Sequence, residues 1–364
     1  MLAENSFWAL MPPKPGGGQC SWLLEANKLC QEHECESCVA ALLEASQAEP
    51  MNYAIHFQMG ICCSAGCRSH SQTSPVIALS HLRVALTLIS SAHQPRERAQ
   101  ILSAMGNTWL TSSRESTQVR LQAAISCFQE GAQIYRSLGD LNAWAREEFN
   151  LGNTYCELSE ETSPGKWVEA VSHYQSALQV RTRVSDPLCY AATLENLGTA
   201  YRQLSFGDKA ANVRKAILCY RKALQVYTAT GFPVQNASLH NNLGNAYVSL
   251  PSADPASTSK NLRRAIRHFD HALRSPTQVS LPRHYAATLF NRGSAFLRLA
   301  LEEQNPQSSL RAAEICFEEA EELFTQCGQV ENARRARQRV EPLRSCLHPP
   351  PSGEAEKLHS QPSE

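Results

Sequence analysis

The stretch Asn242-Leu243-Gly244-Asn245-Ala246-Tyr247 has counterparts along most of the chain. These are Asn196-Leu197-Gly198-Thr199-Ala200-Tyr201, Asn150-Leu151-Gly152-Asn153-Thr154-Tyr155, Asn291-Arg292-Gly293-Ser294-Ala295-Phe296 and a looser Ala104-Met105-Gly106-Asn107-Thr108-Trp109. The glycines at positions 60, 106, 152, 198 and 244 follow one another at intervals of 46 residues, and Gly293 comes 49 residues later. A fixed period of this length predicts an array of similar structural units.

Each unit is predicted to contain two helices. The first carries the glycine motif, and the second carries a pattern such as Ala216-Ile217-x-x-Tyr220-x-x-Ala223-Leu224. In both, apolar residues recur with the i, i+3, i+4, i+7 spacing of an amphipathic helix. Prolines are expected near the starts of first helices, where a missing N–H costs little; they are Pro95, Pro187, Pro233 and Pro282. Asp186 is a candidate N-cap, and Gly139 and Gly231 are candidate ends of second helices.

The small residues explain why such helices pair. Two helices approach to about 8 Å only where small side chains lie at the crossing, and the repeated glycine and alanine provide them. The aromatic residue of the second helix then fills the gap between one hairpin and the next. A single hairpin cannot bury both of its faces, so the hairpins must stack.

The predicted fold is therefore an all-α solenoid, a right-handed superhelix of about seven hairpins with a C-terminal capping helix. Its expected units are 19–52, 53–94, 95–139, 140–185, 186–231, 232–280 and 281–328, with the cap at 330–347. Residues 1–18 are interpreted as a disordered leader without the features of a signal peptide, and 348–364 as a disordered tail.

These motifs resemble the tetratricopeptide repeat family over residues 19–347. The resemblance is to its longer-unit branch, which includes Leu-Gly-Asn repeat polarity adaptors and kinesin light chains, whose units carry a similar Asn-Leu-Gly-Asn-x-Tyr run. The unit of 46 residues departs from the usual 34, so longer helices are expected. The resemblance implies a tetratricopeptide-repeat-like solenoid that binds other proteins.

The recurring asparagines are the main candidate for a binding site. Asparagine is a poor helix former, but its amide offers both a donor and an acceptor to the backbone of an extended peptide. The resemblance implies a concave peptide groove lined by Asn107, Asn150, Asn153, Asn196, Asn242, Asn245 and Asn291. The alternative is that these amides bond to neighbouring helices and hold the stack together. Arg202 and Arg298, one turn beyond the motif, are candidates for meeting acidic groups, or else solvated helix-end arginines.

Other classes of function fit less well. A carboxylate clamp would need lysine one residue before the motif, where the chain instead has Ser103, Phe149, Glu195, Asn241 and Phe290. Lys plus Arg and Asp plus Glu both number 34, a balance that disfavours nucleic-acid binding. No apolar run is long enough to span a bilayer. Without an export signal, the 14 cysteines are expected to be reduced in an intracellular, cytoplasmic protein.

A metal site and an enzyme are the remote alternatives. Two cysteine-rich stretches hint at metal binding: Cys30, His33, Cys35 and Cys38, and then Cys62, Cys63 and Cys67. No second well-spaced pair follows, and Cys127, Cys219 and Cys316 precede the second-helix aromatic residue as small apolar fillers. No phosphate-binding or metalloprotease motif is present. The arginine run from Arg334 to Arg339 is either a nuclear-import or partner patch or a solvated helix face.

The sequence thus predicts a protein-binding adaptor or scaffold, without enzymatic activity, cofactor or metal. The alternative is a structural subunit that uses convex or terminal surfaces within a larger assembly. The partner is expected to be a peptide segment or helix of another protein, and the oligomeric state stays open.

Overall fold

The structure is a computed structural model that describes residues 35–64, 75–89, 94–161, 164–275 and 281–347. Within these residues the fold is all-α, with fourteen α-helices and no strand. The chain divides into two compact units, Met1–Ser185 and Asp186–Glu364, which we call the N-terminal and C-terminal units. The predicted leader 1–18 and tail 348–364 lie outside the described residues.

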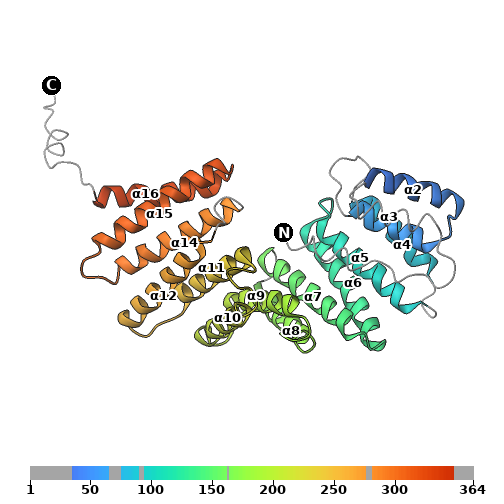
Figure 1. The fold of residues 1–364 in the computed structure, drawn as a ribbon, viewed down its shortest axis with the longest axis horizontal. Coiled ribbons are helices and arrows are strands. Elements are labelled where there is room, and N and C mark those ends of the chain that lie inside the picture. Colours follow the sequence, from blue (N-terminus) through green and yellow to red (C-terminus); the bar gives the residue numbers. More distant parts are fainter. Residues whose placement is uncertain (1–34, 65–74, 90–93, 162–163, 276–280, 348–364) are drawn as a thin grey trace, which may run out of the picture. The chain divides into compact units, whose positions relative to one another are not determined.

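The N-terminal unit is a series of antiparallel helix pairs (Figure 1). Its helices are α2 (Cys35–Ala48), α3 (Tyr53–Ser64), α4 (Pro75–Leu88), α5 (Pro95–Thr111), α6 (Thr117–Ser137), α7 (Leu141–Glu161), the short 3₁₀ helix η2 (Pro164–Lys166) and α8 (Trp167–Ala177). The helices α3, α5 and α7 carry the glycine motif and pack against α4, α6 and α8, respectively.

The C-terminal unit repeats this arrangement. Its helices are α9 (Pro187–Gln203), α10 (Lys209–Ala223), α11 (Pro233–Ser249), α12 (Pro255–Leu273), α14 (Pro282–Ala300), α15 (Gln307–Gln326) and α16 (Val330–Leu347). The helices α9, α11 and α14 carry the motif and pack against α10, α12 and α15. We call the motif-bearing helices of both units first helices and their partners second helices.

Most of the predicted helix boundaries are confirmed. First helices begin at Pro95, Pro187, Pro233 and Pro282, and Asp186 caps α9 by accepting a hydrogen bond from the backbone of Cys189 at 3.1 Å. Gly139, just beyond α6, has the left-handed φ of +69° that favours glycine at a helix end. The prediction for Gly231 was wrong, because α10 already ends at Ala223 and the chain makes turns before the glycine.

The motif glycine is the point of closest approach within each hairpin. A Cβ atom on Gly152 would lie 2.5 Å from the Tyr174 ring, which is only 1% exposed. Gly106, Gly198 and Gly244 meet the rings of Phe128, Tyr220 and Phe269 in the same way, and Gly60 meets Leu82. The ring also reaches the next hairpin, since Phe128 clusters with Leu151 of α7. The glycine therefore permits a close contact between the two helices of one hairpin, and the ring that makes this contact can also pack against a neighbouring hairpin.

The last helix, α16, covers the end of the C-terminal unit. It buries Ala333, Ala336, Val340 and Leu343 against the preceding helices. Three of its arginines pair with carboxylates: Arg337 with Glu321 and Arg344 with Glu318 of α15, and Arg334 with Glu331 of its own helix at 2.7 Å. Arg335 instead lies over the Phe290 ring of α14. Two of the four arginines from Arg334 to Arg339 are thus offset by local carboxylates.

One pair of facing residues within the hairpin alternates between polar and apolar from one hairpin to the next. It joins the residue four positions before the glycine to the residue just before the side chain that covers that glycine. In three hairpins this is a polar pair: His56 and His81 at 3.1 Å, Glu148 and His173 at 2.8 Å, and His240 and His268 at 3.0 Å. In the hairpins between and after them, leucine and cysteine stand at those positions: Leu102 and Cys127, Leu194 and Cys219, and Leu289 and Cys316.

Burial keeps the second histidine pair neutral. Burial, with nearby His271 and Arg274, lowers the pKa of His240 to about 4. Burial, together with His240, His271 and neighbouring arginines, likewise lowers the pKa of His268 to about 4. Because these folded-state pKa values lie below the ordinary 6.5, the stability from neutral imidazoles is present above pH 6.5 and is lost as the pH falls toward 4.

Replacing His240 with leucine and His268 with cysteine should therefore remove much of the acid sensitivity of this hairpin. Leucine and cysteine stand at the same positions in the preceding hairpin, as Leu194 and Cys219. After allowance for the partial exposure of both imidazoles, we expect wild type to lose about 1 kcal/mol more than the variant between pH 7 and pH 5. Urea unfolding followed by circular dichroism at the two pH values measures this difference. Identical pH dependence of the two proteins would contradict it.

Candidate functional site: the polar row on the first helices

The predicted binding residues all lie on first helices. The N-terminal unit holds Asn107 on α5 and Asn150 and Asn153 on α7, and the C-terminal unit holds Asn196 and Arg202 on α9, Asn242 and Asn245 on α11, and Asn291 and Arg298 on α14. Every one of these asparagines is half-buried, as expected for residues at the edge of a helix crossing. The asparagines differ in whether their amides form hydrogen bonds with other residues of the chain.

Some of the amides link neighbouring first helices. In the C-terminal unit, Glu195 of α9 accepts hydrogen bonds from the Asn242 amide at 3.1 Å and from Ser238 at 2.7 Å, both on α11. The Asn291 amide of α14 donates to Asn241 of α11 at 3.1 Å. These amides act between successive hairpins and hold the stack, which is the structural alternative considered for the whole set.

The asparagine directly after the glycine has a different partner, the ring on the second helix. The Tyr174 hydroxyl donates to the Asn153 amide oxygen at 2.7 Å, and at the equivalent position Thr199 bonds to the Tyr220 hydroxyl at 3.1 Å. Where that ring is phenylalanine, no hydroxyl is available. This is the situation of Asn107 and Asn245, whose glycines are covered by Phe128 and Phe269.

Asn107 and Asn245 are consequently the two members of the set whose amides form no hydrogen bond within the described parts of the chain. Asn196 has an interaction partner, and Asn150 lies within hydrogen-bonding reach of Glu147. A half-buried amide without a protein partner keeps its donor and acceptor for water or for a ligand. The geometry therefore separates two available amides from five that are engaged.

The two predicted arginines both contact the protein itself. Arg202 is half-buried and interacts with the Tyr220 hydroxyl, which lowers the pKa that burial of this phenol otherwise raises. Arg298 is exposed and donates to the backbone oxygen of Val248 at 2.7 Å, which joins α14 to the end of α11. Neither is simply a solvated helix end.

Asn291 also lies in a pocket of about 240 Å³ formed by α14, the end of α15 and α16. Its lining consists of Arg283, Ala287, Phe290, Asn291, Phe324, Gln329, Asn332 and Arg335. The Arg335 guanidinium lies over the Phe290 ring, 5.6 Å from its centre. The pocket combines an aromatic wall, amides and two guanidinium groups, a set that suits an acidic or amide side chain.

Two glutamates, the buried Glu147 and the half-buried Glu195, lie beside the candidate asparagines on the first helices. Glu147 of α7 is fully buried and accepts a hydrogen bond from Ser103 of α5 at 2.8 Å, and burial raises its pKa despite adjacent Arg146. Burial likewise raises the pKa of Glu195, opposed by its bonds from Ser238 and Asn242. Both acids connect neighbouring first helices, so they belong to the scaffold of the site.

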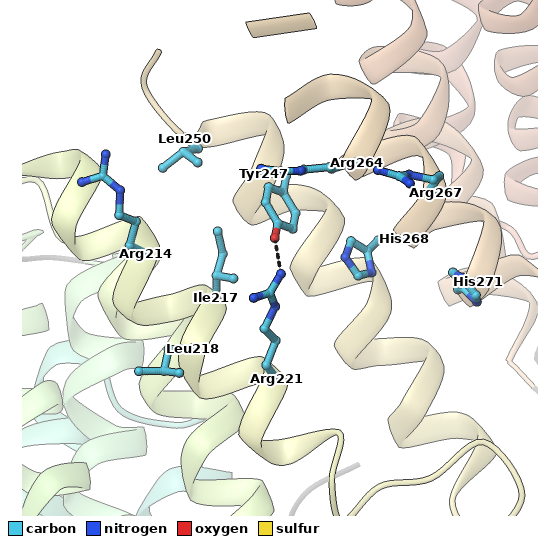
Figure 2. A pocket seen from close by; sticks show the side chains of 10 residues that line it. All are labelled: Arg214, Ile217, Leu218, Arg221, Tyr247, Leu250, Arg264, Arg267, His268 and His271. Carbon is cyan, nitrogen blue, oxygen red and sulfur yellow. Dashed lines mark hydrogen bonds between the residues drawn. The ribbon is translucent and has the colours of Figure 1, made fainter. Parts of the chain in front are cut away.

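The structure also contains a larger cavity that the sequence analysis did not predict. It has a volume of about 700 Å³ and lies on the second helices α10 and α12 (Figure 2). Four arginines line it: Arg214, Arg221, Arg264 and Arg267. The signal that would have found it is local, because residues 209–273 contain nine Lys and Arg but only two Asp and no Glu, whereas the whole chain is balanced.

The described residues show no candidate metal site. Among the described residues, no group of three or more metal-binding side chains occurs. Cys62 and Cys63 are buried in α3, while Cys30, His33 and Cys67 lie outside the described residues, as do the side chains of Cys35 and Cys38. No described helix combines the length and apolar character that a membrane span requires.

Neither a protein-family model nor a curated protein matches the chain, whereas solved structures do. The C-terminal part of a tetratricopeptide-repeat-containing protein from Cytophaga hutchinsonii is similar with a TM-score of 0.55 and 9% identity, over 87% of this chain and 98% of that one. The apo form of RapI is similar with a TM-score of 0.50 and 12% identity, over 89% of this chain and 96% of that one.

A signal-transduction ATPase of the STAND type with a tetratricopeptide repeat sensor, from Pyrococcus horikoshii, is similar with a TM-score of 0.50 and 13% identity. The match covers 88% of this chain and 46% of the archaeal protein. At such identities the likeness concerns the fold, and the predicted relation to the longer-unit branch stays a prediction. The chain has the all-α solenoid fold of tetratricopeptide-repeat proteins.

Proposed function

We propose that the protein is a non-enzymatic scaffold that binds extended segments of a partner protein on the first helices of each unit. The observation that carries this proposal is the pair of half-buried amides, Asn107 and Asn245, that no described residue satisfies. A peptide backbone presents alternating N–H and C=O groups, and an asparagine amide can serve both. The solenoid fold supports the proposal, since stacked repeats form extended binding surfaces.

The candidate asparagines have different roles in this proposal. Asn242 and Asn291 are assigned to the stack, because each bonds to a neighbouring first helix. Asn107 and Asn245 are assigned to the ligand, one in each unit. In the C-terminal unit, the pocket containing Arg283 and Arg335 would receive an acidic or amide side chain of the bound segment.

The double substitution Asn107→Ala and Asn245→Ala should reduce partner capture without loss of stability. We expect recovery of specific partners to fall by about tenfold, equivalent to the loss of one or two good hydrogen bonds. The melting temperature should stay within about 2 °C of wild type, because neither substitution removes a hydrogen bond within the described residues of the chain. Affinity capture with quantitative mass spectrometry and a thermal melt by circular dichroism provide the two measurements.

The matched control is Asn242→Ala, which removes one of the hydrogen bonds to the half-buried Glu195 carboxyl. This variant should lower the melting temperature and reduce capture only to the extent that the protein unfolds. The proposal fails if the double variant melts early but captures partners normally, since Asn107 and Asn245 would then be structural.

A further inference from the structure

We propose that the second-helix side of the C-terminal unit is a docking groove for an acidic, partly apolar segment of a partner protein. We call this surface the α10–α12 groove; it is the cavity of about 700 Å³ shown in Figure 2. That volume falls within the range of about 300–1,000 Å³ typical of binding sites. The groove involves none of the asparagines, so this site is independent of the one on the first helices.

Two helices build the groove with the same spacing. On α10 the lining residues are Arg214, Ile217, Leu218 and Arg221, and on α12 they are Arg264, Arg267, His268 and His271. Each set follows i, i+3, i+4, i+7, which places its members in one stripe along a helix. The end of α11 contributes Tyr247 and Leu250 between the stripes (Figure 2). The cavity is therefore lined by both basic and apolar side chains.

The positive charge of the groove is not offset locally. No carboxylate lines it, and the two aspartates of residues 209–273 are engaged elsewhere. Asp254 caps the start of α12, and Asp270 pairs with Arg292 of α14 at 2.8 Å. Arg221 bonds to the Tyr247 hydroxyl at 2.7 Å, a neutral partner that leaves its charge uncompensated. A cleft with one sign of charge attracts ligands of the other sign.

The charge of the groove at neutral pH comes from its arginines. The pKa of His268 is lowered to about 4 by burial, so its imidazole is neutral and serves as a packing surface. Guanidinium groups stay charged throughout the physiological range and form paired hydrogen bonds with carboxylates. The groove is therefore suited to carboxylate side chains over a wide pH range.

The apolar surface favours a protein segment over a nucleic acid. Leu218 lies at the edge of the groove with 55% of its surface exposed, beside Ile217 and Leu250. Nucleic-acid grooves combine basic residues with aromatic faces on which bases stack. Here the Tyr247 ring is stacked on His268 at 5.5 Å and faces the Arg264 guanidinium at 5.8 Å, so it is covered by neighbours. Acidic side chains interspersed with leucines would match both components of the surface.

Fluorescence anisotropy with the full chain tests this proposal. The probe is a labelled short peptide that alternates Glu and Leu, and the comparison peptide has Gln in place of every Glu. We expect the Glu peptide to bind at least about tenfold more tightly than the Gln peptide, with an affinity that falls as salt is added. The variant Arg214→Glu with Arg267→Glu should weaken binding of the Glu peptide by at least about tenfold, because both arginines are exposed in the groove.

The matched control is Arg311→Glu with Arg339→Glu, which changes the net charge equally at exposed positions on α15 and α16. It should change the affinity by less than about twofold, which is the effect of distant charges under screening. Should the groove variant melt early, Arg214→Gln with Arg267→Gln removes the charge more gently and is expected to weaken binding in the same direction.

Three results would overturn the proposal: equal binding of the two peptides, equal loss in the groove variant and its control, or displacement of the peptide by a lower concentration of a single-stranded oligonucleotide of equal charge. The variant Asn107→Ala with Asn245→Ala should leave binding of the Glu peptide unchanged. This last measurement separates the α10–α12 groove from the proposed first-helix site, so that either can fail alone.

Discussion

Replacing Gly152 with alanine should destabilise the N-terminal unit by about 2–3 kcal/mol, the cost of forcing an extra methyl group into a filled core. The new Cβ atom would lie 2.5 Å from the Tyr174 ring, a separation that real Cβ atoms do not adopt. The ring cannot move aside easily, because it is 1% exposed and its hydroxyl is bonded to Asn153. The two helices must therefore separate, which weakens the packing of α7 against α8.

The control for this prediction is the same substitution at a different buried glycine. A Cβ atom on Gly131 of α6 would find its nearest neighbours, Ala99 and Ser103, at 3.7 Å, which is ordinary contact. Alanine at this interior helical position should stabilise the protein by about 0.5–1 kcal/mol, because glycine is the poorer helix former. Chemical denaturation of both variants measures the difference. Destabilisation of equal size at the two positions would contradict the role assigned to the motif glycine.

Replacing Glu147 with glutamine should have the second largest effect, a gain of about 1–3 kcal/mol at pH 7, because glutamine removes a buried charge whose desolvation is only partly offset. Glu147 is fully buried, and one of its oxygens has no hydrogen-bond partner in the described residues. Burial is the main cause of its raised pKa, opposed by Arg146 and Ser103. Glutamine keeps the shape of the side chain and removes the charge.

The sign of this effect depends on pH. Because the folded-state pKa is raised, the contribution of Glu147 to stability is complete below about pH 4.5, its unfolded value, and is lost as the pH rises through the folded value. Thermal melts should therefore show the variant above wild type at pH 7, with the two converging near pH 4.5. A variant that is less stable than wild type at pH 7 would mean that Arg146 holds Glu147 in its charged form.

The sequence predicted the helices and their pairing well, because the period, the prolines and the small residues all point to the same fold. It failed at Gly231, where apolar spacing continues past the true end of α10. There Tyr227 leaves the helix so that its hydroxyl bonds to Leu188 at 3.2 Å and its backbone oxygen accepts from Asn236 at 2.7 Å. These contacts join Tyr227 to residues of neighbouring first helices, so the spacing of apolar residues within the second helix does not predict them.

The positions of the candidate asparagines on the first helices could be predicted from the sequence, but their hydrogen-bond partners could not. The asparagines could be found from the motif, but which amides are available depends on the ring in the paired helix, as in Asn153 with Tyr174 and Asn245 with Phe269. The α10–α12 groove was missed because the charge was summed over the whole chain. The excess of arginine and lysine around α10 and α12 is balanced by acidic residues spread over the rest of the chain, so the total is zero.

The phenol and phenyl rings above the motif glycines have a consequence for how such an array can change its ligand. The hydroxyl oxygen of a tyrosine on the second helix forms a hydrogen bond with the amide after the glycine, whereas a phenylalanine leaves that amide without this bond. The ring fills the same space in either case. Under the proposed function, exchanging tyrosine and phenylalanine at these positions would thus change which amides a ligand can reach, although the ligand itself would not touch the exchanged ring.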